Sequence, residues 1–490
     1  MPTDVAAWVK KYRTKAKIIH DGLWGTFELY PYHLAILDTP LLQRLRFIKQ
    51  TGCTYLTYPS SLHSRFEHTI GVLYQTIKIA SVITARTPKK LGETELANLS
   101  VAAIMHDTGH GPFSHSSEEF YSSLGHMASY IQEQEAAGFK SGAGEVLSSF
   151  IVESKPFRAF ISQINEICAM RLDCDQISKI ITGRLGDENM YLSEIVHGPF
   201  DADKLDYLHR DGMFSGLQMN VDLDRLLNSI GVETYPVPHV AGRRQTRIVG
   251  TVAGTTPLEQ IMFNKMLLHV GIYHHPKVRA CDCMLQAIFE ISVEKSVNVG
   301  GVKLEQATDF LQLTDDFLLM SALTEDATIK KIIQDIRDRR IWKRAIVIAR
   351  RTVPEDAHSN KMAFQLLVKM AGSDRAYRDQ RKELATKIWE EAGKPCEQHE
   401  VWLDLPKPPN LNEAKRTWIS VGNAAAPIEL QDIVPVEDWV NQYVTHKWRG
   451  HVFCPEDARQ KINQAAQNVL LTKFDLAFNA LATSLAKIDQ

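Results

Sequence analysis

The chain has 490 residues, with 56 lysines and arginines, 58 aspartates and glutamates, and 44% apolar residues. Apolar and charged fractions near the globular average exclude a disordered chain. A net charge of −2 excludes binding to nucleic acid or membranes through overall basicity. No stretch approaches the roughly 18 apolar residues of a membrane span, so we expect no membrane partner.

Apolar residues recur three and four positions apart through roughly the first 230 residues, which is the spacing of amphipathic helices. The predicted helices include 41–48, 66–83, 95–105, 129–135 and 258–289, and the predicted strands are short and late, at 247–252, 345–349 and 417–421. The sequence therefore predicts a mainly α protein, in which a helical core precedes a smaller mixed α/β lobe.

The seven cysteines are odd in number and contain no Cys-x-x-Cys pair. Spread thinly over a long chain, they are typical of reduced thiols. The N-terminus lacks the basic and then apolar order of a signal peptide. We therefore expect a cytoplasmic protein without disulfides.

Six of the 18 histidines fall between His63 and His126, where an even spread would place about two. His68 opens one predicted helix, and the pair His106-Asp107 ends another. Imidazole and carboxylate ligands together suit Mg²⁺, Mn²⁺, Fe²⁺ or Zn²⁺. We expect the adjacent pair to bind one divalent ion with ligands from two other elements.

Two features close to this cluster need a separate interpretation. A second His-Asp pair, His20-Asp21, precedes Gly22, and we interpret it as a loop without a metal site. Gly109 and Gly111 follow the pair His106-Asp107, and we expect them to let the backbone turn sharply and approach a substrate.

Four stretches resemble the deoxynucleoside triphosphate triphosphohydrolases of the HD-domain superfamily. They are 36–50 (ILDTPLLQRLRFIKQ), 63–72 (HSRFEHTIGV), 106–115 (HDTGHGPFSH) and 201–211 (DADKLDYLHRD). The likeness runs from about Lys17 to about Val278, so we expect no SAM-type domain before it. We expect an N-terminal extension at 1–16, an HD catalytic core at 17–290 and a regulatory or oligomerisation lobe at 291–490.

The resemblance implies a role for individual residues. His68, His106, Asp107 and Asp203 match the four metal ligands, and His110, His115 and His126 match histidines of the phosphate site. Further matches are the substrate-binding residues Gln50, Arg65, Lys204, Tyr207, Asp211, Lys265 and Tyr273. Asp38, Gln43 and Arg46 match a nucleotide-effector site of regulated members, although a helix cap and a structural ion pair explain Asp38 and Arg46 equally well.

The resemblance also implies a reaction and partners. Water would attack the α-phosphate of a nucleoside triphosphate, releasing nucleoside and triphosphate, and His115 is our first choice of acid for the leaving oxygen, with Glu118 beside it. Relatives assemble as dimers, tetramers or hexamers, and some need a nucleotide activator.

Two alternatives stay open. One is an HD phosphodiesterase or 5′-nucleotidase acting on cyclic nucleotides or monophosphates. The other is a non-catalytic binder of nucleotides or nucleic acid. The near-neutral charge argues against dominant nucleic-acid affinity, while a basic patch at Arg243, Arg244 and Arg247 leaves it open.

Overall fold

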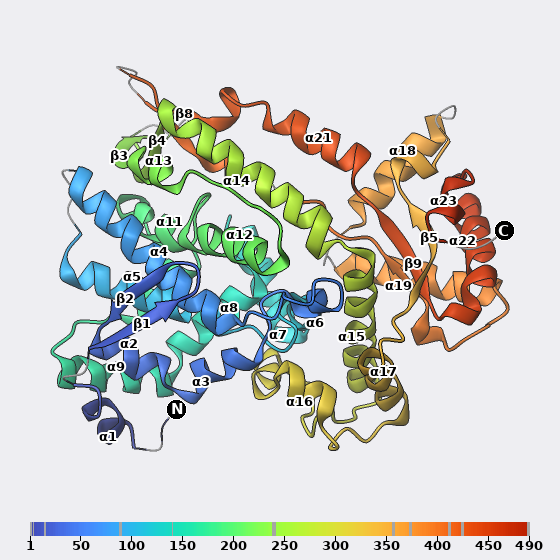
Figure 1. Ribbon diagram of the computed structural model, residues 1–490, viewed down its shortest axis with the longest axis horizontal. Coiled ribbons are helices and arrows are strands. Elements are labelled where there is room, and N and C mark those ends of the chain that lie inside the picture. Colours follow the sequence, from blue (N-terminus) through green and yellow to red (C-terminus); the bar gives the residue numbers. More distant parts are fainter. Residues whose placement is uncertain are drawn as a thin grey trace.

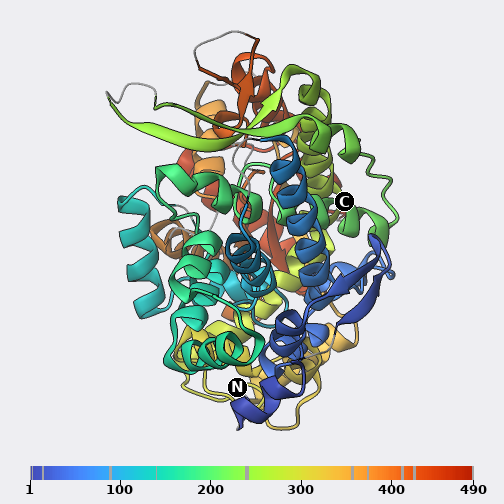
Figure 2. The same ribbon diagram turned by 90° about the vertical axis from the view of Figure 1, so that its left-hand side faces the viewer.

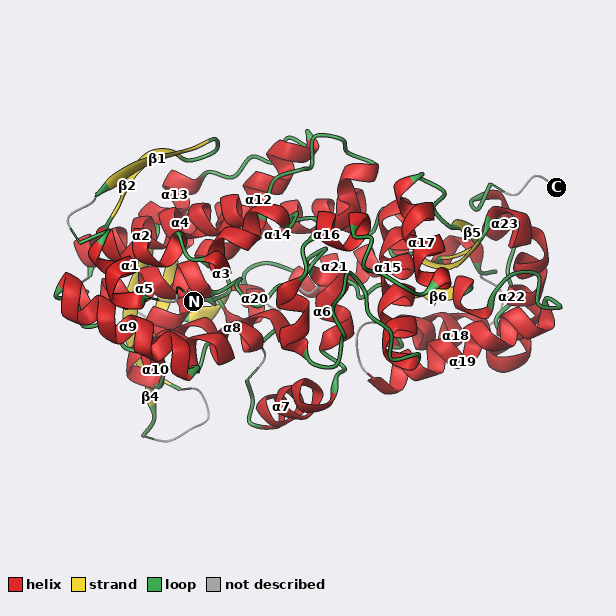
Figure 3. Cartoon of the chain, turned by 90° about the horizontal axis from the view of Figure 1, so that it is seen from below, coloured by secondary structure: helices red, strands yellow, loops and turns green. Residues whose placement is uncertain are grey.

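The computed structural model of the chain describes residues 2, 4–13, 16–87, 91–139, 141–237, 242–354, 358–371, 375–409, 413–422 and 426–487. Helices make up most of this structure, and three small sheets accompany them, which confirms the predicted mainly α class (Figure 3). In the described part of the chain, no helix has the length and apolarity needed to cross a membrane.

The first half of the chain forms a helical body around one large apolar core (Figure 1). Its helices are α1 Val5–Lys10, α2 Pro31–Leu37, α3 Pro40–Gln43, α4 Arg65–Arg86, α5 Glu93–Met105, α6 His115–Tyr121, α7 Gly125–Ala136, α8 Ala143–Glu153, α9 Lys155–Cys168, α10 Cys174–Ile181, α11 Met190–Val196, α12 Ala202–Ser215, α13 Leu223–Asn228 and α14 Thr255–Leu268. Helix α4 packs between α5 and α12 near the middle of this body, which brings three separate segments of the chain together (Figure 2).

The second half is a mixed α/β region with one apolar cluster of its own and another that it shares with α6, α7 and α8 of the first half. Its helices are α15 Pro276–Glu294, α16 Asp315–Met320, α17 Ala327–Arg337, α18 His358–Lys369, α19 Arg375–Glu391, α20 Glu413–Arg416, α21 Val436–His446, α22 Arg459–Phe474 and α23 Leu481–Ser484. A three-stranded antiparallel sheet, in the order β5 (Lys343–Ile348), β9 (Gly450–Cys454) and β6 (Trp402–Asp404), forms its centre.

A four-stranded sheet joins the two halves. Strands β3 (Ile230–Pro236) and β4 (Arg244–Thr251) form a hairpin, and β7 (Trp418–Ser420) runs parallel to β4 with β8 (Ile428–Glu429) beyond it. Ile419, Leu430 and Tyr443 therefore lie in the core of the first half. The division of the chain at residue 290, which falls inside α15, stays a prediction.

The structure corrects three local predictions. Strands are not confined to the later chain, because β1 (Lys17–Asp21) and β2 (Gly25–Leu29) form an early antiparallel hairpin. The predicted helix 41–48 is α3 followed by a 3-10 helix at Arg44–Phe47. The predicted helix 258–289 is α14 and α15 with a π-helical turn at His269–Tyr273 between them, because Pro276, which has no N–H, begins α15.

Candidate metal and phosphate site

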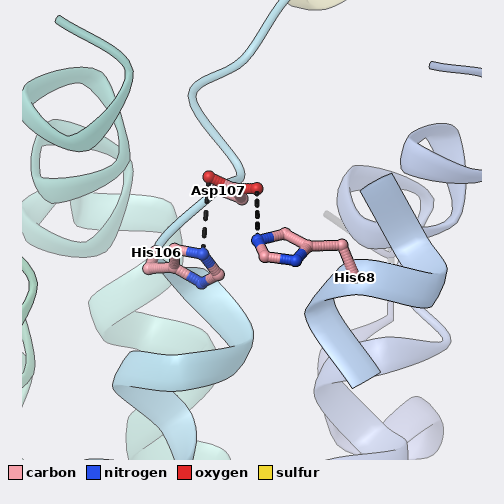
Figure 4. A group of neighbouring side chains, drawn as sticks. All are labelled: His68, His106 and Asp107. Carbon is pink, nitrogen blue, oxygen red and sulfur yellow. Dashed lines mark ion pairs between the residues drawn. The ribbon is translucent and has the colours of Figure 1, made fainter. Parts of the chain in front are cut away.

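Three helices deliver the four predicted metal ligands to one place. Ser64 and Glu67 cap the start of α4 reciprocally, which places His68 in its first turn. His106 and Asp107 follow the end of α5, and Asp203 lies in the first turn of α12, which Asp201 caps. Figure 4 shows His68 and His106 pointing at Asp107 from two different helices.

The ligand atoms of this quartet lie close together. His68 Nε2 is 3.0 Å from Asp203 Oδ1 and 3.5 Å from Asp107 Oδ2. His106 Nε2 is 3.4 Å from Asp107 Oδ1 and 3.9 Å from Asp203 Oδ1. Two imidazole nitrogens and two carboxylates therefore share a volume that one cation can occupy.

The tautomers of both histidines favour metal binding. His106 donates from Nδ1 to the Ala103 carbonyl at 2.7 Å, and His68 donates from Nδ1 to Asp206 Oδ2 at 2.7 Å. Each Nε2 is left buried without a well-aligned hydrogen bond within the described chain. Such orphaned nitrogens beside carboxylates fit a divalent metal ion, which accepts their lone pairs.

The charges of the site are strongly coupled. Burial lowers the pKa of His68, but Asp203, Asp206 and Asp107 outweigh this effect and raise it to about 10. Burial opposes ionisation of Asp203 as well, yet the facing His68 holds the pKa of that carboxyl well below its usual range. The cluster thus attracts positive charge strongly when no metal is bound.

Two cations stand next to the quartet. Arg65 is almost fully buried and donates to Asp107 Oδ2 at 2.5 Å and to Ser114 Oγ at 2.8 Å. Its remaining terminal nitrogen, Nη2, is buried and has no hydrogen-bond partner in the described residues. Lys204 Nζ donates to Asp201 Oδ2 at 2.7 Å and to the Gly198 carbonyl at 2.9 Å. Both side chains can meet an anion beside the metal ligands.

Two histidines, His110 and His115, share the carboxylate of Glu118. Glu118 Oε2 lies 2.8 Å from His115 Nδ1 and 3.7 Å from His110 Nδ1, and Oε1 accepts from the Gly144 N–H at 3.0 Å. Burial opposes ionisation of Glu118, but both histidines hold the pKa of its carboxyl well below its usual range. His115 is 78% exposed, whereas His110 is buried and 3.3 Å from Asp107. These three side chains could also hold a second cation.

A strained turn places His115. Phe113 and Ser114 have φ values of 56° and 54°, which residues other than glycine rarely adopt. Asp315 of α16 accepts from the backbone N–H of Phe113 at 2.6 Å and of Lys49 at 2.9 Å. Ser114 Oγ donates to the Lys49 carbonyl at 2.6 Å. The second half of the chain thereby fastens two loops of the site.

A cavity of about 430 Å³ opens over these groups. Predicted site residues that line it are Gln50, Arg65, His106, Asp107, His110, His115, Asp203, Lys204, Tyr207, Asp211 and Tyr273. Asp211 accepts from Tyr273 Oη at 2.5 Å, and its other oxygen lies 2.7 Å from His63 Nε2. The Gln50 Oε1 atom is buried without a partner in the described chain. This part of the cavity therefore offers hydrogen-bonding groups in addition to the metal ligands and cations.

Other predicted residues lie elsewhere. His126 is exposed on α7, which projects at the bottom of the view in Figure 3 and packs against α8 through Tyr130 and Phe150, and Lys265 is paired with Glu413. Neither is among the described residues that line the cavity.

The three effector candidates have partners inside the chain. Tyr12 donates to Asp38 at 2.9 Å, and Gln43 donates to the Leu37 carbonyl at 2.9 Å. Arg46 donates to Gln43 at 2.8 Å and stacks on Phe66. They lie at the surface near α2 and α3, so the effector role stays a prediction.

Sequence reasoning did not identify two residues that position side chains of the site. Asp206 orients the metal ligand His68, and His63 holds Asp211, a predicted substrate-binding residue. Asp206 is spaced three residues after Asp203 on α12, and this spacing was the available signal. Gly109 is also used differently from the expectation, because a Cβ atom there would lie 2.1 Å from the Gly144 carbonyl. It lets α8 pack closely and does not face a substrate.

Comparison with known proteins gives two family matches and several relatives. The models match an HD domain at residues 65–211 and an HD associated region at residues 244–477. The deoxynucleoside triphosphate triphosphohydrolase SAMHD1 homolog of Dictyostelium discoideum is 26% identical over 339 residues, which is 68% of this chain and 60% of that protein. SAMHD1 of Homo sapiens is 26% identical over 359 residues, covering 67% of this chain and 54% of its own length.

An uncharacterized protein of Methanocaldococcus jannaschii is 30% identical over 309 residues, which is 62% of this chain and 56% of that protein. The chain thus spans little more than half the length of these relatives. The matches confirm the resemblance that the sequence motifs indicated.

Proposed function

Since the chain carries an HD domain followed by an HD associated region, we propose that it is a metal-dependent phosphohydrolase. Its substrates are deoxynucleoside triphosphates, which it cleaves at the α-phosphate to nucleoside and intact triphosphate. The observation that supports this proposal best is one cavity lined by His106, Asp107 and Asp203, with the fourth ligand, His68, buried against Asp203. Tyr207, Asp211 and Gln50 line the same cavity.

Four side chains would hold the metal: His68 and His106 through Nε2, and Asp107 and Asp203 through a carboxylate oxygen. A divalent ion bound there supplies Lewis-acid polarisation of a phosphoryl oxygen and lowers the pKa of water. Mg²⁺, Mn²⁺, Fe²⁺ and Zn²⁺ are all compatible with this ligand set.

The cations of the cavity would bind the triphosphate. Arg65 has an unpartnered nitrogen beside Asp107, and Lys204 lines the same cavity. Both are held in place by carboxylates, so they meet the phosphate chain without losing much further side-chain freedom. They offset negative charge that grows on the phosphoryl oxygens during attack by water.

His115 would protonate the leaving 5′-oxygen. It is the exposed member of the His110–Glu118–His115 group, and Glu118 accepts from its Nδ1. The carboxylate thereby orients the ring, so that Nε2 is the nitrogen that would pass a proton to the leaving oxygen. His110 is buried, and burial together with Arg65 lowers its pKa, so it suits a neutral hydrogen-bonding role.

The hydrogen-bonding groups around Asp211 would bind the sugar and base. Tyr273 and His63 fix both oxygens of Asp211, so this carboxylate presents a defined acceptor to a 3′-hydroxyl. Gln50 and Tyr207 stand on the same wall. Thr51 at the cavity edge is a small residue, so ribonucleotides belong among the substrates to be tested.

A panel of all deoxynucleoside and ribonucleoside triphosphates, singly and mixed, with Mg²⁺ or Mn²⁺, tests the proposal. We expect nucleoside and triphosphate in equal amounts. Turnover only in mixtures would add a nucleotide activator. With cyclic nucleotides and monophosphates included in the panel, release of a linear nucleotide or of inorganic phosphate from them would favour the phosphodiesterase or nucleotidase alternative. Binding without turnover under every condition would contradict a hydrolase and favour the non-catalytic binder.

A further inference from the structure

The carboxylate that orients His68 has no free acceptor position. Asp206 Oδ2 receives His68 Nδ1 at 2.7 Å and Arg210 Nε at 2.8 Å. Its Oδ1 receives Arg210 Nη2 at 2.8 Å and Trp24 Nε1 at 2.5 Å. A carboxylate has about four lone-pair positions, so all of them are occupied by donors. Asp206 therefore cannot rotate or release His68 without breaking several charge-assisted hydrogen bonds.

Two of the donors that fix Asp206 depend on the β1–β2 hairpin: Trp24 belongs to it, and Arg210 is paired with it through Asp21. Trp24, in the turn after β1, donates directly to Asp206 and stacks on Tyr74 of α4 at 5.8 Å between ring centroids. Asp21, the last residue of β1, lies 3.1 Å from Arg210 Nη2. Its other oxygen accepts from the backbone N–H groups of Leu23 and Trp24 at 2.9 and 2.8 Å, which shapes the turn.

The packing around Asp206 leaves no room for its carboxylate to adopt another position. Asp206 is completely buried, and Arg210 and Asp21 are nearly so. A Cβ atom at Gly71 of α4 would lie 1.8 Å from Asp206 Oδ1, so α4 touches this carboxylate directly. Such a network fixes its geometry as a unit.

We propose that the tip of the β1–β2 hairpin, through Asp21 and Trp24, is a positioning element of the metal centre. It holds Asp206, Asp206 holds the proton of His68 on Nδ1, and His68 Nε2 stays aimed at the metal. The hairpin lies outside the matched HD domain, which begins at residue 65. This inference rests on the metal centre of the proposed function but not on the substrate.

Metal affinity of the full chain is the direct test. The protein is stripped with a chelator and titrated with Mn²⁺, and free Mn²⁺ is measured by electron paramagnetic resonance. Trp24→Phe keeps an aromatic ring against Tyr74 and removes the indole N–H together with part of the ring volume. We expect Mn²⁺ binding to weaken about 3- to 10-fold, because one hydrogen bond to a charged acceptor is lost. Asp206→Asn should weaken it about 10- to 100-fold.

Trp8→Phe is the matched control, because Trp8 donates its indole N–H to the Ala35 carbonyl at 2.9 Å, outside the network. A merely structural role of Trp24 predicts equal Mn²⁺ affinity in both variants and similar losses of Tm. Should Trp24→Phe fail to fold, Asp21→Asn replaces it, since asparagine keeps the turn acceptor and loses the charge opposite Arg210; the expected weakening is again about 3- to 10-fold.

Each outcome decides the inference. Weaker binding in Trp24→Phe or Asp21→Asn, with wild-type affinity in Trp8→Phe, supports it. Wild-type affinity in folded hairpin variants overturns it and leaves the metal centre intact. A wild-type chain that binds none of Mn²⁺, Mg²⁺, Fe²⁺ or Zn²⁺ overturns the metal centre of the proposed function, and the inference with it.

Discussion

His115 and Glu118 illustrate how a single side chain acquires a role from its partners. Glu118 is tied to the Gly144 N–H and to His115, and the two histidines keep it ionised. A fixed carboxylate thus holds Nδ1 of an exposed imidazole and sets the orientation of the ring. The same imidazole without Glu118 would be an ordinary surface histidine.

Replacing His115 tests the assigned acid. We expect His115→Ala to lower kcat by about 10²- to 10⁴-fold, the range of general acid catalysis, while Mn²⁺ affinity stays at the wild-type value. His446→Ala, an exposed histidine on α21, serves as the control. Steady-state rates with a deoxynucleoside triphosphate and Mn²⁺ titration make the comparison. Near-wild-type turnover of His115→Ala with metal bound would remove His115 from the mechanism.

The ligands were easier to predict than the residues that support them. His68, His106, Asp107 and Asp203 match a motif at fixed positions, and the structure brings them together. Asp206 is signalled only by its spacing from Asp203, and Asp21 by no motif, because their roles depend on which rotamers meet after three helices and a hairpin have packed. Asp21 belongs to the His-Asp pair that we interpreted as a loop without a metal site, yet it braces Arg210.

At the scale of elements, the end of α5 is held by close contact with α8. Gly109 N donates to Ser148 Oγ at 2.8 Å, and Ser148 Oγ donates to the His106 carbonyl at 2.7 Å. The carbonyl of Gly144 occupies the space of a Cβ atom at position 109. The orientation of His106 and Asp107 therefore depends on α8.

Gly109→Ala should push α8 away from this turn. We expect a loss of about 1–3 kcal/mol in the free energy of unfolding, typical of overpacking, together with weaker metal binding. Gly186→Ala is the control, because nothing lies within 4 Å of a Cβ atom there. Urea denaturation of both variants measures the difference. Equal stability of Gly109→Ala and Gly186→Ala would mean that α8 moves to accommodate the added methyl group without a cost in stability.

Asp315 connects α16 to both loops of the site and gives a pH dependence. Burial raises the pKa of its carboxyl to about 6, although Lys49 opposes the shift. The folded chain thus binds this proton more tightly than the unfolded chain. Asp315 therefore adds stability as the pH falls from above 6 toward 4, and this stability is lost as the pH rises through 6.

Comparing the wild type with Asp315→Asn isolates the effect of this carboxyl on stability, because the two proteins have all other titratable groups in common. The free energy of unfolding of wild type minus that of the variant should increase by about 2 kcal/mol between roughly pH 8 and roughly pH 4.5. Urea denaturation at several pH values gives this difference. A difference that does not change with pH would show that Asp315 does not titrate in this range.

Element boundaries show where periodicity alone was insufficient. Helices at 66–83 and 95–105 were predicted well, because long apolar faces pack against one core. The early hairpin was missed, because β1 and β2 are only five residues each and mostly exposed. The break between α14 and α15 follows from Pro276 and a π-helical turn that an apolar period does not reveal.

At the scale of the whole molecule, α14 carries an exposed apolar row. Phe263 and Leu267 of α14 and Val270 of the π-helical turn that follows it are 43%, 57% and 37% exposed and are spaced four and three residues apart. The sequence resemblance predicts a homo-oligomer, and a second copy covering this row would remove apolar surface from water.

Leu267→Glu should disrupt such an assembly. We expect mass photometry to show an oligomer for wild type and a shift toward monomers for the variant. Leu323→Glu, which changes a leucine that is 59% exposed elsewhere, should behave as wild type. A monomeric wild-type chain, or an unchanged oligomer of Leu267→Glu, would contradict the use of this row.

The central claim joins the whole molecule to one reaction: metal held by two histidines and two aspartates, and water attacking the α-phosphate. Hydrolysis of a deoxynucleoside triphosphate in ¹⁸O-labelled water, with the stripped chain reloaded with Mn²⁺, tests it most directly. We predict equal amounts of nucleoside and triphosphate, with the label in the triphosphate and no turnover before metal is added. Label in inorganic phosphate, or no hydrolysis of any triphosphate with metal bound, would contradict the account.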